Sequence, residues 1–84
     1  MSKTILIVDD NAMNRALLGN MLSGEYEIFE AYDGKDALDI IRKSHQMLSA
    51  VLLDILMPVM DGYETLSQIR DSVEFSDIPV IMVT

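Results

Sequence analysis

Four short strand-like runs, separated by three stretches with helical spacing, constrain the fold of this chain most strongly. The runs lie at residues 4–8, 26–31, 50–53 and 79–83. The first and third are aliphatic or β-branched throughout, which is typical of strands covered on both faces of a parallel sheet. The order strand, helix, strand, helix, strand, helix, strand requires right-handed crossovers. The sequence therefore predicts an α/β fold with a doubly wound parallel sheet.

Each helical stretch begins with a polar residue suited to a helix start. Asn11 is the expected N-cap of the first, and Asp36 suits the first turn of the second. Asp61 and Glu64 have the spacing of a capping box before the third, and Gly62 is free to take a positive φ. The predicted apolar faces are Met13, Leu17, Leu18, Met21 and Leu22, then Ala37, Leu38, Ile40 and Ile41, then Tyr63, Leu66, Ile69 and Val73.

The composition limits the chain to one small acidic domain. It has 84 residues, no cysteine and a formal net charge of −8. The negative charge disfavours nucleic acid and anionic lipid, and favours cations and basic partner surfaces. The N-terminus lacks the pattern of a signal peptide, and no apolar stretch approaches the ~20 residues of a membrane span. The sequence therefore predicts a cytoplasmic location without membrane binding.

Polar residues gather where the predicted strands end. Asp9 and Asp10 follow the first strand, Asp54 ends the third, and Thr84 ends the fourth. Carboxyl ends of parallel strands share one edge of the sheet, so three carboxylates and a hydroxyl converge there if the first and third strands are neighbours. Mg²⁺ suits such a carboxylate set, and a carboxylate beside it can act as a nucleophile and form an acyl phosphate.

Taken singly, these residues have simpler interpretations. Asp9 and Asp10 could be solvated helix caps, and Thr84 could be an ordinary β-branched strand residue. His45, near the end of the second helical stretch, is interpreted as structural because a positive charge suits that end of a helix. Only the joint placement of the aspartates with Met57-Pro58, Asp61-Gly62 and Thr84 favours a functional site.

Three sequence blocks resemble the receiver domain of bacterial two-component response regulators. They are residues 7–11 (IVDDN), residues 52–62 (LLDILMPVMDG) and residues 79–84 (PVIMVT). The resemblance extends over the whole chain and implies a flavodoxin-like receiver fold with strand order 2-1-3-4. It also implies that residues 1–84 are the N-terminal portion of a receiver domain, without the fifth strand and the last two helices.

The resemblance assigns a role to each residue of the predicted site. It implies that Asp54 is the phospho-acceptor and that Thr84 donates its hydroxyl to a phosphoryl oxygen as part of the switch. It implies that Asp10 binds Mg²⁺ directly, that Asp9 acts largely through water, and that the backbone carbonyl of Leu56 completes the protein ligands. The lysine and the aromatic residue that the family carries on its fifth strand have no counterpart here.

The expected function is a phosphorylation-dependent signalling switch. The resemblance implies phosphoryl transfer to Asp54 from a sensor histidine kinase, a phosphotransfer protein or a small phosphodonor. Such a module catalyses only its own phosphorylation and dephosphorylation, so it is not expected to be a metabolic enzyme. Two alternatives are a receiver-like interaction module that does not switch, and an aspartyl-phosphate phosphatase of the haloacid dehalogenase type. The phosphatase needs a second aspartate two residues after the nucleophile, where this chain has Leu56.

The fourth predicted strand suggests self-association of the chain. Its run Val80-Ile81-Met82-Val83 carries no charge. In the strand order that the resemblance implies, this strand lies between the third and a fifth that the chain lacks. An open apolar edge strand tends to pair with another chain.

Overall fold

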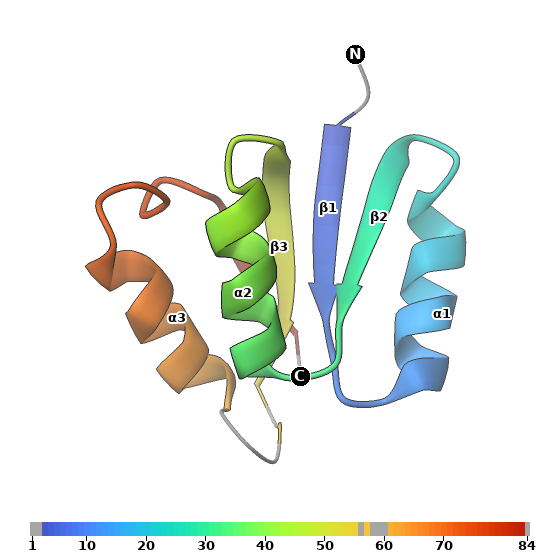
Figure 1. Cartoon of the computed structure of the whole chain (residues 1–84). Helices are drawn as coiled ribbons and strands as arrows, with labels where there is room; N and C mark the ends of the chain where they lie inside the picture. The colour runs from blue at the N-terminus through green and yellow to red at the C-terminus, as the bar shows by residue number, and fades with distance from the viewer. Residues whose placement is uncertain (1–2, 56, 58–60, 84) are drawn as a thin grey trace.

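The computed structural model describes residues 3–55, 57 and 61–83 as a parallel sheet with three helices. All paired strands are parallel, and Figure 1 shows the strands that it labels running in one direction, with the helices packed alongside. The strand order is β2-β1-β3-β4, which confirms the predicted fold class and strand order. The elements are β1 (Lys3–Val8), α1 (Ala12–Leu22), β2 (Tyr26–Ala31), α2 (Gly34–Ser44), β3 (Leu48–Asp54), α3 (Gly62–Asp71) and β4 (Val80–Val83).

The order in which strands are added to the sheet reverses after β2, because β3 is placed on the other side of β1. β2 lies on one side of β1 and β3 on the other, so right-handed crossovers place α1 and α2 on opposite faces of the sheet. β1 lies between β2 and β3. It pairs with both strands up to Val8, which stands opposite Ala31 and Leu53. The crossover through α1 therefore starts at the carboxyl end of β1, and the crossover through α2 starts beside it at the carboxyl end of β2.

All three helices start with the same short-range hydrogen bond. The N-cap side chain accepts from a backbone N–H three residues later: Asn11 from Asn14 (3.1 Å), Asp33 from Asp36 (2.8 Å) and Asp61 from Glu64 (2.8 Å). This bond satisfies one of the N–H groups that a helix start leaves without a partner. The N-cap predicted at Asn11 is confirmed.

The main core lies between the sheet and the helices α2 and α3. Leu6, Val8, Val51 and Leu53 belong to this cluster of buried residues. Helices α2 and α3 contribute Ala37, Leu38, Ile41 and Ile69. The apolar face predicted for α2 is therefore confirmed.

The apolar face predicted for α1 is not buried. Met13, Leu17 and Met21 are 80%, 60% and 73% exposed, and no residue of α1 is buried. Helical periodicity identifies which residues share a face, but burial requires a second element on that face. Within the described residues, the main strand contacts of α1 are with β1 and β2, and they leave these side chains exposed.

The apolar face predicted for α3 is partly wrong. Ile69 is buried and Leu66 is half-buried, but Tyr63 is 65% and Val73 is 92% exposed. Thr65 is fully buried instead, and its hydroxyl donates to the carbonyl of Asp61 (2.9 Å). That bond satisfies the polar atom, so a threonine replaces the expected tyrosine on the buried face.

The connection from α3 to β4 is held by one arginine. Arg70 donates through Nη1 to the backbone carbonyls of Ser76 and Ile78. His45 is the C-cap of α2, and its ring centroid lies 5.7 Å from that of Phe75 in the same connection. Within the described ranges, every helix is too short or too polar to cross a membrane.

Candidate functional site

Three aspartates from two neighbouring strands converge at the carboxyl end of the sheet. Asp9 and Asp10 follow β1 and Asp54 ends β3, as the sequence predicted. Each offers a carboxylate oxygen, and these oxygens all lie within 4.8 Å of one another. Asp9 is buried, Asp54 is half-buried and Asp10 is exposed, so the cluster opens to solvent on one side.

Asp9 is held by hydrogen bonds at three of its atoms. Its backbone N–H donates to the carbonyl of Ala31 on β2 (3.1 Å), which extends the β1–β2 ladder by one residue. Its Oδ1 accepts from the backbone N–H of Asn11 (2.9 Å), and its carbonyl accepts from Nη1 of Arg15 (2.7 Å). The loop between β1 and α1 therefore turns around a buried aspartate whose N–H, carbonyl and Oδ1 are all hydrogen-bonded.

Asp54 lies at the meeting point of β3, β4 and the start of α3. It stands opposite Val83 in the sheet register. The next residue, Ile55, donates its N–H to the carbonyl of Val83 (3.1 Å) and accepts at its own carbonyl from the N–H of Gly62 (2.9 Å). These two backbone bonds connect the end of β4 to the start of α3 through the residue that follows Asp54.

Gly62 is required for close approach, and it does not use the positive φ that a glycine is free to take. None of the described glycines has a positive φ. A Cβ at Gly62 would lie 2.5 Å from the carbonyl oxygen of Asp54 and 2.7 Å from Cα of Ile55. The N-terminus of α3 thus packs against the Asp54 backbone at a distance that only a residue without a side chain allows.

A hollow of about 250 Å³ adjoins the acidic cluster. Its lining joins Asp9 and Asp54 to α1 and β4, through Asn14, Leu17, Leu18 and Val83. One wall is therefore acidic and the other largely apolar.

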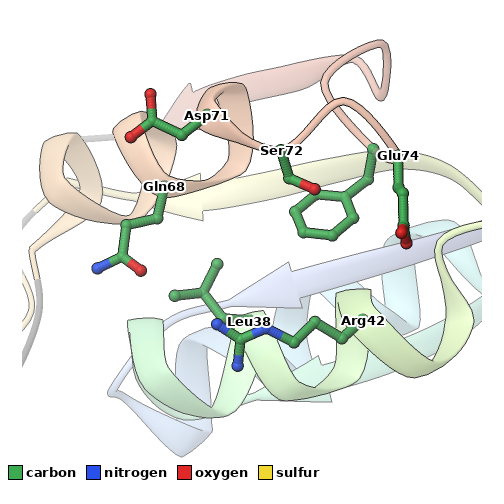
Figure 2. A pocket seen from close by; sticks show the side chains of 7 residues that line it. Leu38, Arg42, Gln68, Asp71, Ser72 and Glu74 are labelled. Carbon is green, nitrogen blue, oxygen red and sulfur yellow. The ribbon is translucent and has the colours of Figure 1, made fainter.

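A larger groove lies between α2 and the end of α3, away from the aspartates. Figure 2 shows Gln68, Asp71, Ser72 and Glu74 facing Leu38 and Arg42 of α2 across it. The lining residues come from the middle and end of α2, from the end of α3 and from the connection that follows α3. This groove is thus remote from the carboxylate cluster.

Several residues named in the sequence prediction lie outside the described residues. They are Leu56, with its predicted ligand carbonyl, Pro58 and Thr84. Met57 is described and is buried in the main core. The predictions for Leu56 and Thr84 stay predictions.

The sequence interpretation assigned no function to Arg15. Besides its bond to the Asp9 carbonyl, its Nε donates to Oε1 of Glu30 on β2 (3.1 Å), and its side chain is only 17% exposed. A sequence signal exists in part, because an arginine one turn into a helix can reach back to the preceding loop. The identity of its acceptors depends on the three-dimensional arrangement.

The chemistry of this donor set fits a hard divalent cation. Mg²⁺ prefers carboxylate oxygens and keeps several of its waters, which suits a partly open cluster of three carboxylates. The three like charges would otherwise repel each other at short range. The arrangement can therefore hold a cation beside Asp54, the carboxylate at the end of β3.

Comparison with protein families identifies the chain. Residues 5–84 match the response regulator receiver domain. The chain belongs to the response regulator receiver domain family, which serves phosphorylation-dependent signalling. The resemblance found in the sequence blocks is confirmed.

Known proteins and structures of this family support the same conclusion. The chain is 36% identical to the polar-differentiation response regulator DivK of Brucella ovis, over 100% of this chain and 68% of that protein. It is 44% identical to a probable cyclic di-GMP phosphodiesterase of Vibrio cholerae, over 96% of this chain but only 18% of that protein. The receiver protein structure from Methanoculleus marisnigri superimposes with a TM-score of 0.91 at 40% identity, covering 96% of this chain and 65% of that one.

The chain spans only a fraction of several other relatives. It covers 6% of histidine kinase P4 of Formosa agariphila, at 38% identity. It covers 33% of the probable transcriptional regulator ycf27 of Cyanophora paradoxa, at 43% identity. The activities in these names belong to those whole proteins.

Proposed function

We propose that this chain is a phosphorylation-dependent switch that accepts a phosphoryl group on Asp54 with Mg²⁺ bound beside it. The observation that supports this most is the convergence of Asp9, Asp10 and Asp54 at the carboxyl end of the sheet. In a member of the receiver family, that convergence is a reason to place the phosphoryl chemistry at these residues.

In this proposal the three aspartates have different roles. Asp10, the exposed member, binds Mg²⁺ directly, and the buried Asp9 acts largely through water. The Leu56 carbonyl completes the protein ligands, and the Thr84 hydroxyl donates to a phosphoryl oxygen. Bound Mg²⁺ supplies positive charge that offsets the carboxylates and the incoming phosphoryl oxygens.

The proposed reaction is a transfer between two covalent carriers. A carboxylate oxygen of Asp54 attacks the phosphorus of a phosphohistidine on a sensor kinase or phosphotransfer protein. The new bond is an acyl phosphate O–P bond, while the P–N bond breaks and its electron pair remains on the imidazole nitrogen. A small phosphodonor such as acetyl phosphate gives the same acyl phosphate and releases acetate. The half-buried position of Asp54 at an open cluster supports access by either donor.

The alternatives predict different outcomes in the same experiment. An interaction module that does not switch would take up no phosphate. A phosphatase of the haloacid dehalogenase type would release phosphate from substrates repeatedly, but the position two residues after Asp54 holds Leu56 rather than the required aspartate. We therefore propose self-modification rather than metabolic turnover.

Labelling with acetyl phosphate tests this proposal. The chain should gain one phosphoryl group, detected by mass spectrometry, with Mg²⁺ and not with EDTA. Asp54→Asn should abolish the gain because it removes the nucleophile with little change in shape. Asp61→Asn is the matched control, because Asp61 caps α3 outside the cluster and asparagine retains the cap. A base-labile phosphate that persists in Asp54→Asn would show that another residue is the acceptor.

A further inference from the structure

The contacts of Arg15 connect three elements that meet at the acidic cluster. The residue belongs to α1, its Nη1 donates to the carbonyl of Asp9 after β1 (2.7 Å), and its Nε donates to Glu30 on β2 (3.1 Å). The guanidinium is planar, so two donors used at once fix its orientation. Its side chain is 17% exposed, whereas that of Glu30 is 50% exposed. The bridge is therefore partly buried at Asp9 and exposed at Glu30.

The bridge acts at the residue where the β1 backbone leaves the sheet. The N–H of Asp9 still pairs with Ala31 on β2, but the Asp9 carbonyl is bonded by Arg15. Beyond that point, Oδ1 of Asp9 accepts from the N–H of Asn11, which begins the turn into α1. The direction in which Asp9 and Asp10 point thus depends on how this peptide unit is held.

We propose that Arg15 is a positioning residue for the acidic cluster, and that Glu30 orients Arg15 in turn. Arg15 holds the Asp9 peptide unit so that the carboxylates of Asp9 and Asp10 face Asp54. This inference rests on the proposed function as far as the ion is concerned. The position of the loop itself can be measured without any ion.

A purely electrostatic effect of Arg15 would act in the opposite direction. Removing a positive charge next to three carboxylates strengthens their attraction for Mg²⁺. Removing a group that positions ligands weakens metal binding, typically by about 10–100-fold for residues behind the ligands. The sign of the change in Mg²⁺ affinity therefore distinguishes the two effects.

The test is a Mg²⁺ titration of the chain and its variants, with amide hydrogen exchange measured without metal. Arg15→Gln should weaken Mg²⁺ binding by about 10-fold or more and speed exchange of the Asn11 amide. Arg15→Lys should recover part of both properties, since an ammonium is a compact point donor that lacks the rigid two-donor fork. Glu30→Gln should give a smaller loss, because the bond to Asp9 remains possible.

Arg42→Gln is the matched control for charge. Arg42 pairs with Asp39 at 3.3 Å on the surface of α2, and both side chains are more than half exposed. This variant changes the net charge as Arg15→Gln does and should leave both measurements unchanged. Urea unfolding without metal tests whether each variant is folded. If Arg15→Gln does not fold, the results for Glu30→Gln and Arg15→Lys decide the outcome.

Two results would overturn the positioning role. One is unchanged or tighter Mg²⁺ binding in Arg15→Gln, and the other is unchanged Asn11 exchange in all three variants. If the parent chain binds no Mg²⁺ and takes up no phosphate, the proposed function fails, and the exchange measurement still decides whether Arg15 holds the loop.

Discussion

Replacing Gly62 with alanine should destabilise the chain because the added methyl group has no room. The new Cβ would lie 2.5 Å from the carbonyl oxygen of Asp54 and 2.7 Å from Cα of Ile55. Both are backbone atoms, which cannot rotate away as a flexible side chain can. Reaching an ordinary contact distance requires a shift of about 0.9 Å. The same shift would strain the 2.9 Å hydrogen bond from Gly62 N–H to the carbonyl of Ile55.

The expected loss is large relative to the stability of a small domain. Overpacking of this kind typically costs about 1–3 kcal/mol, and contact with backbone atoms places this case near the upper value. A chain of 84 residues has on the order of 4–12 kcal/mol of unfolding free energy. With a urea m-value of about 1–2 kcal/mol/M, the unfolding midpoint should fall by roughly 2 M.

Two other glycines provide matched controls for the same substitution. A Cβ at Gly24 meets no atom within 4 Å, and at Gly19 its nearest neighbour is Cγ2 of Ile28 at 3.7 Å, an ordinary contact. Gly24→Ala should therefore be neutral or stabilising by about 0.4–1 kcal/mol. Gly19→Ala should gain up to about 1 kcal/mol because the residue lies inside α1.

Urea unfolding followed by circular dichroism measures all three variants under one set of conditions. The expected order of midpoints places Gly62→Ala well below the parent, with Gly24→Ala and Gly19→Ala at or above it. A Gly62→Ala midpoint equal to that of Gly24→Ala would refute the close-approach argument. The m-values should agree between variants, because only then do the midpoints report stability.

Two further predictions concern the metal and the edge of the sheet. Asp10→Asn should weaken Mg²⁺ binding more than Asp9→Asn in a titration, since a direct ligand is harder to replace than one acting through water; an equal or larger loss at Asp9 would reverse these roles. The chain should also self-associate in sedimentation velocity experiments, because β4 ends the described sheet and its Ile81 is 54% exposed. Ile81→Lys should reduce that association, and a parent chain that stays monomeric at high concentration would contradict the prediction.

Local signals predicted the framework of the fold well. The N-cap at Asn11 and the apolar face of α2 depend on residues close in sequence, and both are confirmed. The strand order followed from the receiver resemblance, and the convergence of Asp9 and Asp54 required only that β1 and β3 be neighbours. These properties follow from spacing and from the geometry of parallel sheets.

Properties that depend on contacts between distant segments could not be predicted in this way. The stripe containing Leu17 in α1 has the correct spacing for burial, but spacing does not reveal whether an element covers it. The role of Gly62 depends on the position of the Asp54 backbone, and the partners of Arg15 lie on two other elements. Each of these properties depends on the positions of distant segments in space, which the spacing of residues along the sequence does not give.

The backbone bonds beside Asp54 have a consequence for how sequences of this kind can diverge. Val83, Ile55 and Gly62 are joined through carbonyl and N–H groups alone. Every residue except proline carries both groups, so side-chain replacements at Val83 or Ile55 leave the chemical groups of the link intact. Side chains at these two positions can therefore be exchanged to suit different partner proteins without removing a hydrogen-bonding group from the link between the end of β4 and the start of α3.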